Sequence, residues 1–100
     1  MLLAEFSLTP LDKGASVSLW VSRSIDLIDR SGLPYRLGPM GTCVEGEWDE
    51  VFAAIKRCHE RMHEMGVPRI SSTLRFGTRT DRVQTMDDKV RSVEEKLRSE

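Results

Sequence analysis

Cysteine is scarce in this chain, because only Cys43 and Cys58 occur among its 100 residues. Two cysteines are too few for a disulfide scaffold, and a reducing compartment would keep both as thiols. Free cysteines commonly pack as small apolar groups, so we interpret both as buried or half-buried side chains without redox or nucleophilic roles. The chain is therefore not expected to be a disulfide-stabilised secreted protein.

Long apolar runs and an excess of positive charge are also absent. The amino terminus reaches Glu5 after four apolar residues, so it lacks the features of a signal peptide, and no segment could span a bilayer. Net charge is −1, and Lys and Arg are distributed among Asp and Glu rather than gathered into a basic face. We therefore expect a cytoplasmic protein with neither a nucleic acid nor a membrane as its partner.

What remains is the composition of an ordinary globular protein, with 39% hydrophobic and 31% charged residues. A chain of this length buries roughly 65% of its unfolded surface, which suffices for one core. We expect a single domain over residues 1–100.

Periodic apolar patterns predict seven elements. The stretch Leu2–Leu8 alternates apolar and more polar residues, as a half-buried strand does, whereas the helical stretches repeat apolar residues every three to four positions. Both longer helices are followed by a Gly-x-Pro sequence, a strong stop signal. The predicted strands are Leu2–Thr9, Tyr35–Met40, Thr42–Gly46 and Arg69–Thr78; the predicted helices are Ser16–Arg30 with Ser16 as cap, Trp48–Met65, and about 86–98, begun by Thr85 and Asp88.

This order predicts an α+β fold, a ferredoxin-like βαββαβ sandwich with an added C-terminal helix. Both long helices would cover one face of an antiparallel sheet, with the first and third strands in its middle. An uncovered sheet face on so short a chain is usually closed by a partner, so we expect self-association. The polar side chains expected on that face are Glu5, Ser7 and Thr9 near Thr73 and Arg75, with Cys43 and Glu45 on the other flank.

The last helix carries a narrow apolar seam formed by Met86, Val90, Val93 and Leu97. Four apolar residues cannot stabilise so short a helix alone. This helix must dock on its own domain or on a neighbouring subunit.

The inventory of reactive residues argues against catalysis. An acylphosphatase-type site needs an amide side chain beside an arginine, yet the chain has no Asn and only Gln84, in a loop. A Ser-His-Asp triad is not expected either, because His59 and His63 share one helix. With Cys58 these histidines could offer two or three metal ligands, but nothing in the spacing supplies another. We expect no enzyme, no metal and no cofactor.

The exposed sides of the central strands point instead to a small ligand. They carry Glu5, Ser7, Cys43 and Glu45, whereas RNA-binding sheets of this topology carry aromatic residues. Carboxylates and hydroxyls suit a small cation bearing amino groups. The alternative is that Glu5, Glu45 and Arg75 pair with one another across the sheet or across a subunit contact.

Three stretches carry a family resemblance: LLAEFSLTPLDKG, GLPYRLGPMGTCVEGEWDEV and SVEEKL. Over nearly its whole length the chain resembles the small thiamine-binding protein family of the YkoF-like superfamily, formerly an uncharacterised protein family. The Pro-Met-Gly-Thr-x-x-Glu-Gly pattern at Pro39–Gly46 is the most specific part. The resemblance implies ferredoxin-like domains that pair through their sheets into dimers or tetramers, and that bind thiamine or its hydroxymethylpyrimidine moiety without converting it.

The resemblance also implies a set of ligand-binding residues. We hypothesise that Thr42 and Glu45 receive the polar edge of the aminopyrimidine and that Met40 forms an adaptable apolar wall. Glu45 or Glu5 would offset the charge of the thiazolium ring. The full predicted set is Ser7, Met40, Gly41, Thr42, Glu45, Gly46 and Glu5.

Strand geometry restricts which of these predicted ligand-binding residues can share one pocket. Thr42 and Glu45 point to opposite sides of a regular strand, so they share one pocket only if Gly41 or Gly46 distorts it. A regulatory or structural oligomer that senses another small metabolite is the second hypothesis. An enzyme with Glu45 as general base is the least favoured, because no nucleophile or second acid is placed beside it.

Overall fold

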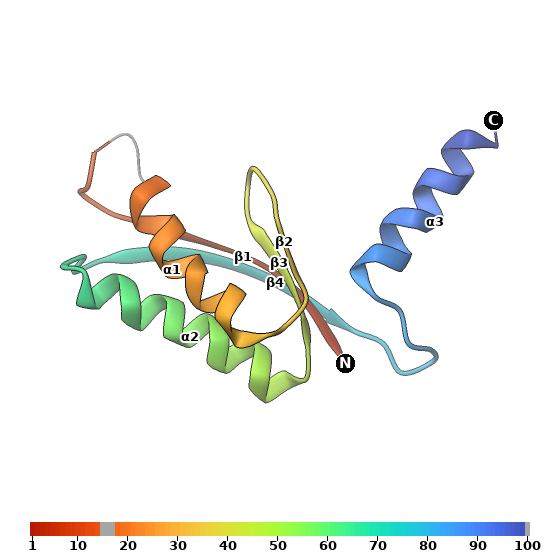
Figure 1. Cartoon of the computed structure of the whole chain (residues 1–100), viewed down its shortest axis with the longest axis horizontal. Coiled ribbons are helices and arrows are strands. Elements are labelled where there is room, and N and C mark those ends of the chain that lie inside the picture. Colours follow the sequence, from red (N-terminus) through yellow and green to blue (C-terminus); the bar gives the residue numbers. More distant parts are fainter. Residues whose placement is uncertain (15–17, 100) are drawn as a thin grey trace.

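The computed structural model, which describes residues 1–14 and 18–99, contains four strands and three helices in the predicted order (Figure 1). It is the expected ferredoxin-like βαββαβ fold with an added C-terminal helix. Ser16, the predicted cap of the first helix, lies outside the described residues. The elements are β1 (Leu2–Pro10), α1 (Ser18–Ser31), β2 (Tyr35–Leu37), β3 (Thr42–Gly46), α2 (Trp48–Glu64), β4 (Ile70–Thr78) and α3 (Met86–Arg98).

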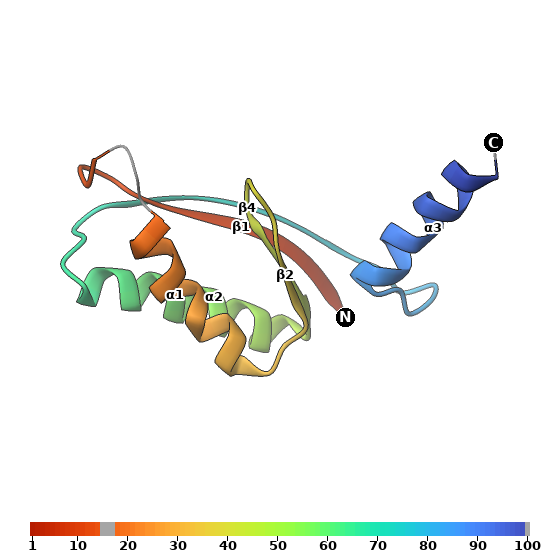
Figure 2. The same ribbon diagram turned by 45° about the horizontal axis from the view of Figure 1, so that its top comes forward.

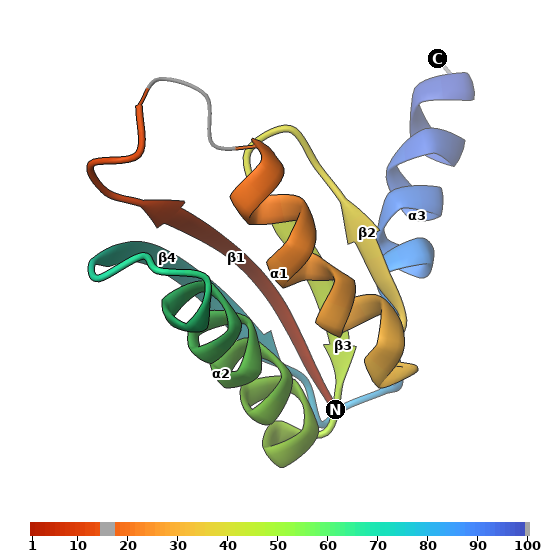
Figure 3. The same ribbon diagram turned by 60° about the vertical axis from the view of Figure 1, so that its left-hand side comes forward.

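The strands form one antiparallel sheet in the order β2-β3-β1-β4, so β1 and β3 lie in the middle as predicted (Figure 3). The ladder between β1 and β3 runs from Leu2 opposite Gly46 to Phe6 opposite Thr42. The ladder between β1 and β4 continues as far as Pro10 opposite Ile70. Among residues 1–14 and 18–99, β1 therefore has no ladder partner on its β3 side beyond Phe6, and a strand edge is left there.

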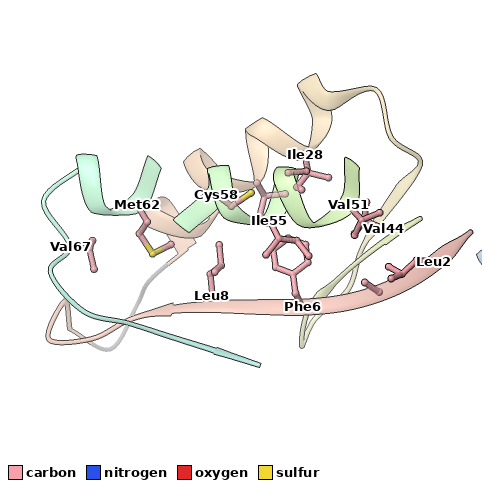
Figure 4. Close-up of a cluster of buried hydrophobic side chains, with 13 residues drawn as sticks. Leu2, Phe6, Leu8, Ile28, Val44, Val51, Ile55, Cys58, Met62 and Val67 are labelled. Carbon is pink, nitrogen blue, oxygen red and sulfur yellow. The ribbon is translucent and has the colours of Figure 1, made fainter. Parts of the chain in front are cut away.

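The core lies between one face of the sheet and the two helices α1 and α2, which run side by side over that face (Figure 3). Alternation along β1 directs every second side chain, from Leu2 to Leu8, into this core (Figure 4). Removing such apolar surface from water contributes about 25 cal/mol per Å² and is the main source of stability. The buried helix residues that meet β1 and β3 include Ile25, Ile28, Val51, Ala54, Ile55, Cys58 and Met62.

Both core helices stop where the Gly-x-Pro sequences predicted. Gly32 and Gly66 have φ angles of +80° and +93°, in the left-handed region that glycine adopts without steric cost. Pro34 and Pro68 follow, and a proline cannot continue the helical hydrogen bonding. The chain is thereby returned to the sheet after each helix.

The second strand is shorter than predicted, because β2 ends at Leu37 and does not reach Met40. The N–H of Gly38 donates to the carbonyl of Gly41 at 2.9 Å, which closes a turn. Pro39, inside that turn, has no N–H to offer to a ladder. Residues 38–41 consequently form the tip of the β2–β3 hairpin.

Helix α3 starts with the predicted capping box, in which Thr85 and Asp88 exchange hydrogen bonds of 3.1 Å between side chains and backbone N–H groups. Its first residue, Met86, is buried, but the rest of the helix extends away from the sheet (Figure 1 and Figure 2). The radius of gyration is 15.2 Å, against about 13 Å for a compact chain of this length. Docking on its own domain is thus confined to the first turn, and Val90, Val93 and Leu97 stay exposed.

Candidate ligand-binding site

The sheet face opposite α1 and α2, hereafter the open face, carries a row of polar side chains across all four strands. The pairing register sets Arg36, Cys43, Glu5 and Arg75 side by side. Arg75 Nη2 donates to Glu5 Oε1 at 2.9 Å, and Cys43 Sγ donates to Glu5 Oε2 at 3.8 Å. The predicted pairing of Glu5 with Arg75 is confirmed, and both carboxylate oxygens of Glu5 have partners within the chain.

Both cysteines favour the neutral thiol, in agreement with the interpretation of both as buried or half-buried apolar groups. Burial, and secondarily the negative charge of Glu5, raises the pKa of the half-buried Cys43. Burial raises the pKa of the core residue Cys58 to about 11. Neither sulfur is activated as a thiolate nucleophile near neutral pH.

Glu45 lies on the open face but is covered by the start of α3. Only 5% of Glu45 is exposed, and its Oε2 accepts a hydrogen bond of 3.0 Å from the backbone N–H of Met86. A carboxylate at this place also interacts favourably with the positive end of the helix dipole. A second link joins the same turn to the sheet, because Arg36 forms an ion pair with Asp87. Glu45 thus holds α3 against the sheet.

Thr42 lies on the other face of the same strand. It is 6% exposed and stands opposite the core residue Phe6, whereas Glu45 stands opposite Leu3. The pairing of residues 42–46 with β1 is continuous, so the strand is not distorted in a way that would bring the two side chains together. Thr42 and Glu45 therefore face opposite sides of the sheet.

The two predicted site glycines lie where the chain passes close to other groups. A Cβ on Gly41 would lie 3.1 Å from the carbonyl oxygen of Phe6 and 3.2 Å from Cγ of Glu5. A Cβ on Gly46 would lie 3.0 Å from a methyl carbon of Leu33. Gly41 thereby allows the hairpin tip to approach β1, and Gly46 allows the chain to pass Leu33 before α2 begins.

A first pocket, the hairpin pocket, lies between α1, the free edge of β1 and the β2–β3 hairpin, and has a volume of about 670 Å³. This volume is typical of small-molecule sites. Phe6, Ile25 and Leu37 give it apolar walls. Four of the predicted ligand-binding residues line it, namely Ser7, Met40, Gly41 and Thr42, whereas Glu5, Glu45 and Gly46 do not.

The hairpin pocket has an acidic side, formed by Asp26 and Asp29 of α1. Tyr35 donates from its hydroxyl to Asp29 Oδ1 at 2.8 Å, and this hydrogen bond is the main cause of the raised pKa of Tyr35. Asp26 forms an ion pair of 2.9 Å with Arg30, one helical turn away. No Lys or Arg belongs to the described lining. The combination of carboxylates, hydroxyls and apolar walls suits a small, flat cation.

Sequence reasoning missed Asp26, Asp29 and Tyr35. The available signal was the spacing of the two aspartates, which lie three residues apart and so share one side of the helix. That spacing alone does not predict a pocket, because the approach of the hairpin to α1 is a property of the tertiary fold.

A second pocket, the basic pocket, lies over the end of the open face and has a volume of about 560 Å³. Its lining includes Glu5 and Cys43 from the central strands. The expectation that no basic face exists was wrong locally, because β4, the following loop and α3 bring cationic side chains together. Those side chains are Arg75, Arg79, Arg82 and Lys89.

The two histidines contact different groups. His59 Nε2 lies 2.7 Å from the hydroxyl of Ser72, and His63 Nδ1 lies 2.7 Å from the carbonyl oxygen of Val67. Burial, followed by the charge of His63, lowers the pKa of His59. Over residues 1–14 and 18–99, no three His, Cys, Asp or Glu side chains are grouped as they would be in a metal site.

Fold and pockets define a ferredoxin-like domain with an acidic pocket beside its first helix and a basic pocket on its open face. The family model for the thiamine-binding protein matches residues 4–94, and the chain belongs to this family. Among the described helices, none is both long and apolar enough to cross a membrane.

Relatives and solved structures agree with this placement. The UPF0045 protein sll0230 of Synechocystis is 48% identical over 84 residues, covering 84% of this chain and 69% of that protein. The crystal structure of the hypothetical protein MJ1052 of Methanocaldococcus jannaschii superposes with a TM-score of 0.86 at 35% identity, covering 94% of this chain and 96% of that one. A Thermotoga maritima protein, provisionally assigned to thiamine biosynthesis or salvage, gives a TM-score of 0.80 at 22% identity, with 92% and 97% covered. This last likeness concerns the fold alone.

Proposed function

We propose that the protein binds thiamine or its hydroxymethylpyrimidine moiety in the hairpin pocket, without converting it, and does so as an oligomer. The observation that carries the proposal is the acidic and partly apolar lining of this pocket in a chain that belongs to the thiamine-binding protein family. Thiamine is a cation with a flat aminopyrimidine ring, so it needs opposite charge, polar partners and apolar walls together.

Each of these requirements has a candidate in the hairpin pocket. The carboxylate of Asp29, assisted by Asp26, would offset the thiazolium charge. The free edge of β1 beyond Phe6 and the hydroxyl groups of the lining would pair with the aminopyrimidine. Met40, which is 87% exposed at the hairpin tip, would close over the ring as a flexible apolar wall.

Under this proposal the predicted set divides into two roles. Ser7, Met40, Gly41 and Thr42 line the binding pocket. Glu5 pairs with Arg75, Glu45 anchors α3 and Gly46 allows close packing, so these three support the fold around the site.

The groups in the pocket support binding without conversion. The hydrogen bond to Asp29 raises the pKa of Tyr35, so the phenol stays neutral and its oxygen is not an active nucleophile. The carboxylate of Asp29 already accepts the hydrogen bond of the Tyr35 hydroxyl, and no histidine or cysteine belongs to the described lining. A covalent catalytic site would instead place a nucleophile within hydrogen-bond distance of a base that a third group orients.

Self-association is supported by the exposed seam of α3, where Val93 and Leu97 are 59% and 70% exposed. A helix with such a seam gains most of its stability by packing against another surface. A dimer or tetramer in which a second copy covers the seam would supply that surface. The alternative function, a regulatory or structural oligomer that senses another small metabolite, shares this feature and differs only in its ligand.

Isothermal titration calorimetry with thiamine and with hydroxymethylpyrimidine tests the proposal. We expect saturable binding of both compounds, and we expect Asp29→Asn to weaken thiamine binding by about tenfold, because the variant keeps an acceptor for Tyr35 but loses the charge. Glu60→Gln, the same change on the exposed side of α2, should leave the affinity unchanged. No heat at millimolar thiamine, from protein shown to be folded, would refute the vitamin-binding function.

A further inference from the structure

The basic pocket carries positive charge to which the thiamine-binding proposal assigns no role. The whole chain has a net charge of −1, yet the described lining of this pocket has four cationic side chains and a single carboxylate, that of Glu5. These cations come from three successive segments, β4, the loop after it and α3, so the pocket exists only because the chain folds back at residues 79–84.

Part of this charge is already paired. Arg75 is bound to Glu5 at 2.9 Å, and Arg79 makes two contacts with Asp81, of 2.6 and 2.9 Å. In contrast, Arg82 and Lys89 form no ion pair with any described residue. The pocket therefore retains two cationic side chains that are available to an anion.

The nearby carboxylates do not cancel these two cations. The charge of Arg82 contributes to the lowered pKa of both Asp81 and Asp88, so these acids lie in its vicinity. The principal partner of Asp81 is nevertheless Arg79, and Asp88 accepts the N–H of Thr85 in the capping box. Both acids lie outside the lining of the pocket.

The remaining walls indicate the shape of the ligand. Met1 and Leu3 give the pocket an apolar side. Gln84 uses its side-chain oxygen to accept from Arg79 at 2.7 Å, which leaves its amide N–H groups free to donate. Arg and Lys bind phosphate oxygens strongly, the former as a planar fork and the latter as a point charge.

We propose that the basic pocket binds the phosphate group of a small phosphorylated organic molecule whose apolar part rests against Met1 and Leu3. Arg82, Lys89 and the Gln84 amide contact the phosphate oxygens. The volume of about 560 Å³ accommodates one small molecule.

Calorimetry with phenyl phosphate and with inorganic phosphate, in a phosphate-free buffer of low ionic strength, tests this site. We expect phenyl phosphate to bind more tightly than inorganic phosphate, and added NaCl to weaken both. The double variant Arg82→Gln/Lys89→Gln should lose at least about tenfold in affinity for phenyl phosphate. Lys56→Gln/Arg57→Gln, which removes the same charge from exposed positions on α2, should not.

Three results would overturn the proposal. One is the absence of phenyl phosphate binding at millimolar concentration to folded protein. Another is an equal loss in the two double variants, which would indicate non-specific attraction. The third is equal affinity for the two probes, which would mean that the apolar wall takes no part. Arg82→Lys/Lys89→Arg, which keeps both charges, should retain most of the affinity and excludes a folding defect as the cause.

The outcome is separable from that of the thiamine titration. Thiamine binding should survive the loss of Arg82 and Lys89, and phenyl phosphate binding should survive Asp29→Asn. Each site can therefore fail while the other stands.

Discussion

The carboxylates of this chain differ in what they already contact, and the proposed division into structural and ligand-binding roles rests on that difference. Glu5 and Glu45 are acidic residues on the open face, and both already accept hydrogen bonds within the chain. Arg75 and Cys43 donate to Glu5, and the first backbone N–H of α3 donates to Glu45. Within the described part of the chain, Asp29 accepts a hydrogen bond from Tyr35, forms no ion pair and lines a pocket. Alternation in the sequence correctly predicted which face each sheet residue occupies, but it could not predict which neighbour would use each carboxylate.

At the same scale, the core thiol of Cys58 makes stability depend on pH in the alkaline range. Its pKa is raised from 9.0 to about 11 in the folded state, so between these values the unfolded chain has lost the proton while the folded chain keeps it. Stability from this group is complete below pH 9 and falls as the pH rises toward 11, by up to about 1.4 kcal/mol per pH unit.

Denaturant unfolding at a series of pH values checks this dependence. The free energy of unfolding of the wild type should fall more steeply between pH 9 and 11 than that of Cys58→Ala, although the variant is less stable throughout because of the cavity. Parallel curves for the two proteins would show that Cys58 does not titrate as described.

The elements were largely predictable because local chemistry defines them. The alternation of Leu2–Leu8 predicted β1, the Gly-x-Pro sequences predicted the ends of α1 and α2, and Thr85 with Asp88 predicted the start of α3. The overestimate of β2 arose at Pro39, whose missing N–H favours a turn over a continued ladder. The direction of α3 was not predictable, because its seam fits either its own domain or another copy.

An experiment on α3 resolves that choice. Truncation after Thr85 should lower the molar mass measured by size-exclusion chromatography with light scattering, because in the proposed oligomer the exposed seam of the helix contacts other subunits. The full-length variant Val93→Ser/Leu97→Ser should behave in the same way, whereas Glu95→Gln, on the opposite side of the helix, should not. An unchanged mass after truncation would show that α3 takes no part in assembly.

At the scale of the whole molecule, the fold separates two kinds of charge that are mixed along the sequence. Acidic residues of α1 meet the β2–β3 hairpin, and basic residues of β4, its loop and α3 meet over the open face. Neither pocket was visible in the sequence, since each depends on segments that only the tertiary structure brings together. The sequence drew attention to the motif Pro39–Gly46, whereas the acidic residues of α1 that lie beside this hairpin were not predicted.

Chemical-shift mapping of ¹⁵N-labelled protein during titration with thiamine tests the central claim most directly. The claim predicts that the largest changes occur in residues 6–9 of β1, residues 25, 26 and 29 of α1 and residues 37–42 of the hairpin, which line the hairpin pocket. Residues 75–89 around the basic pocket should change little. Changes concentrated in residues 75–89, or no changes at saturating thiamine, would contradict it.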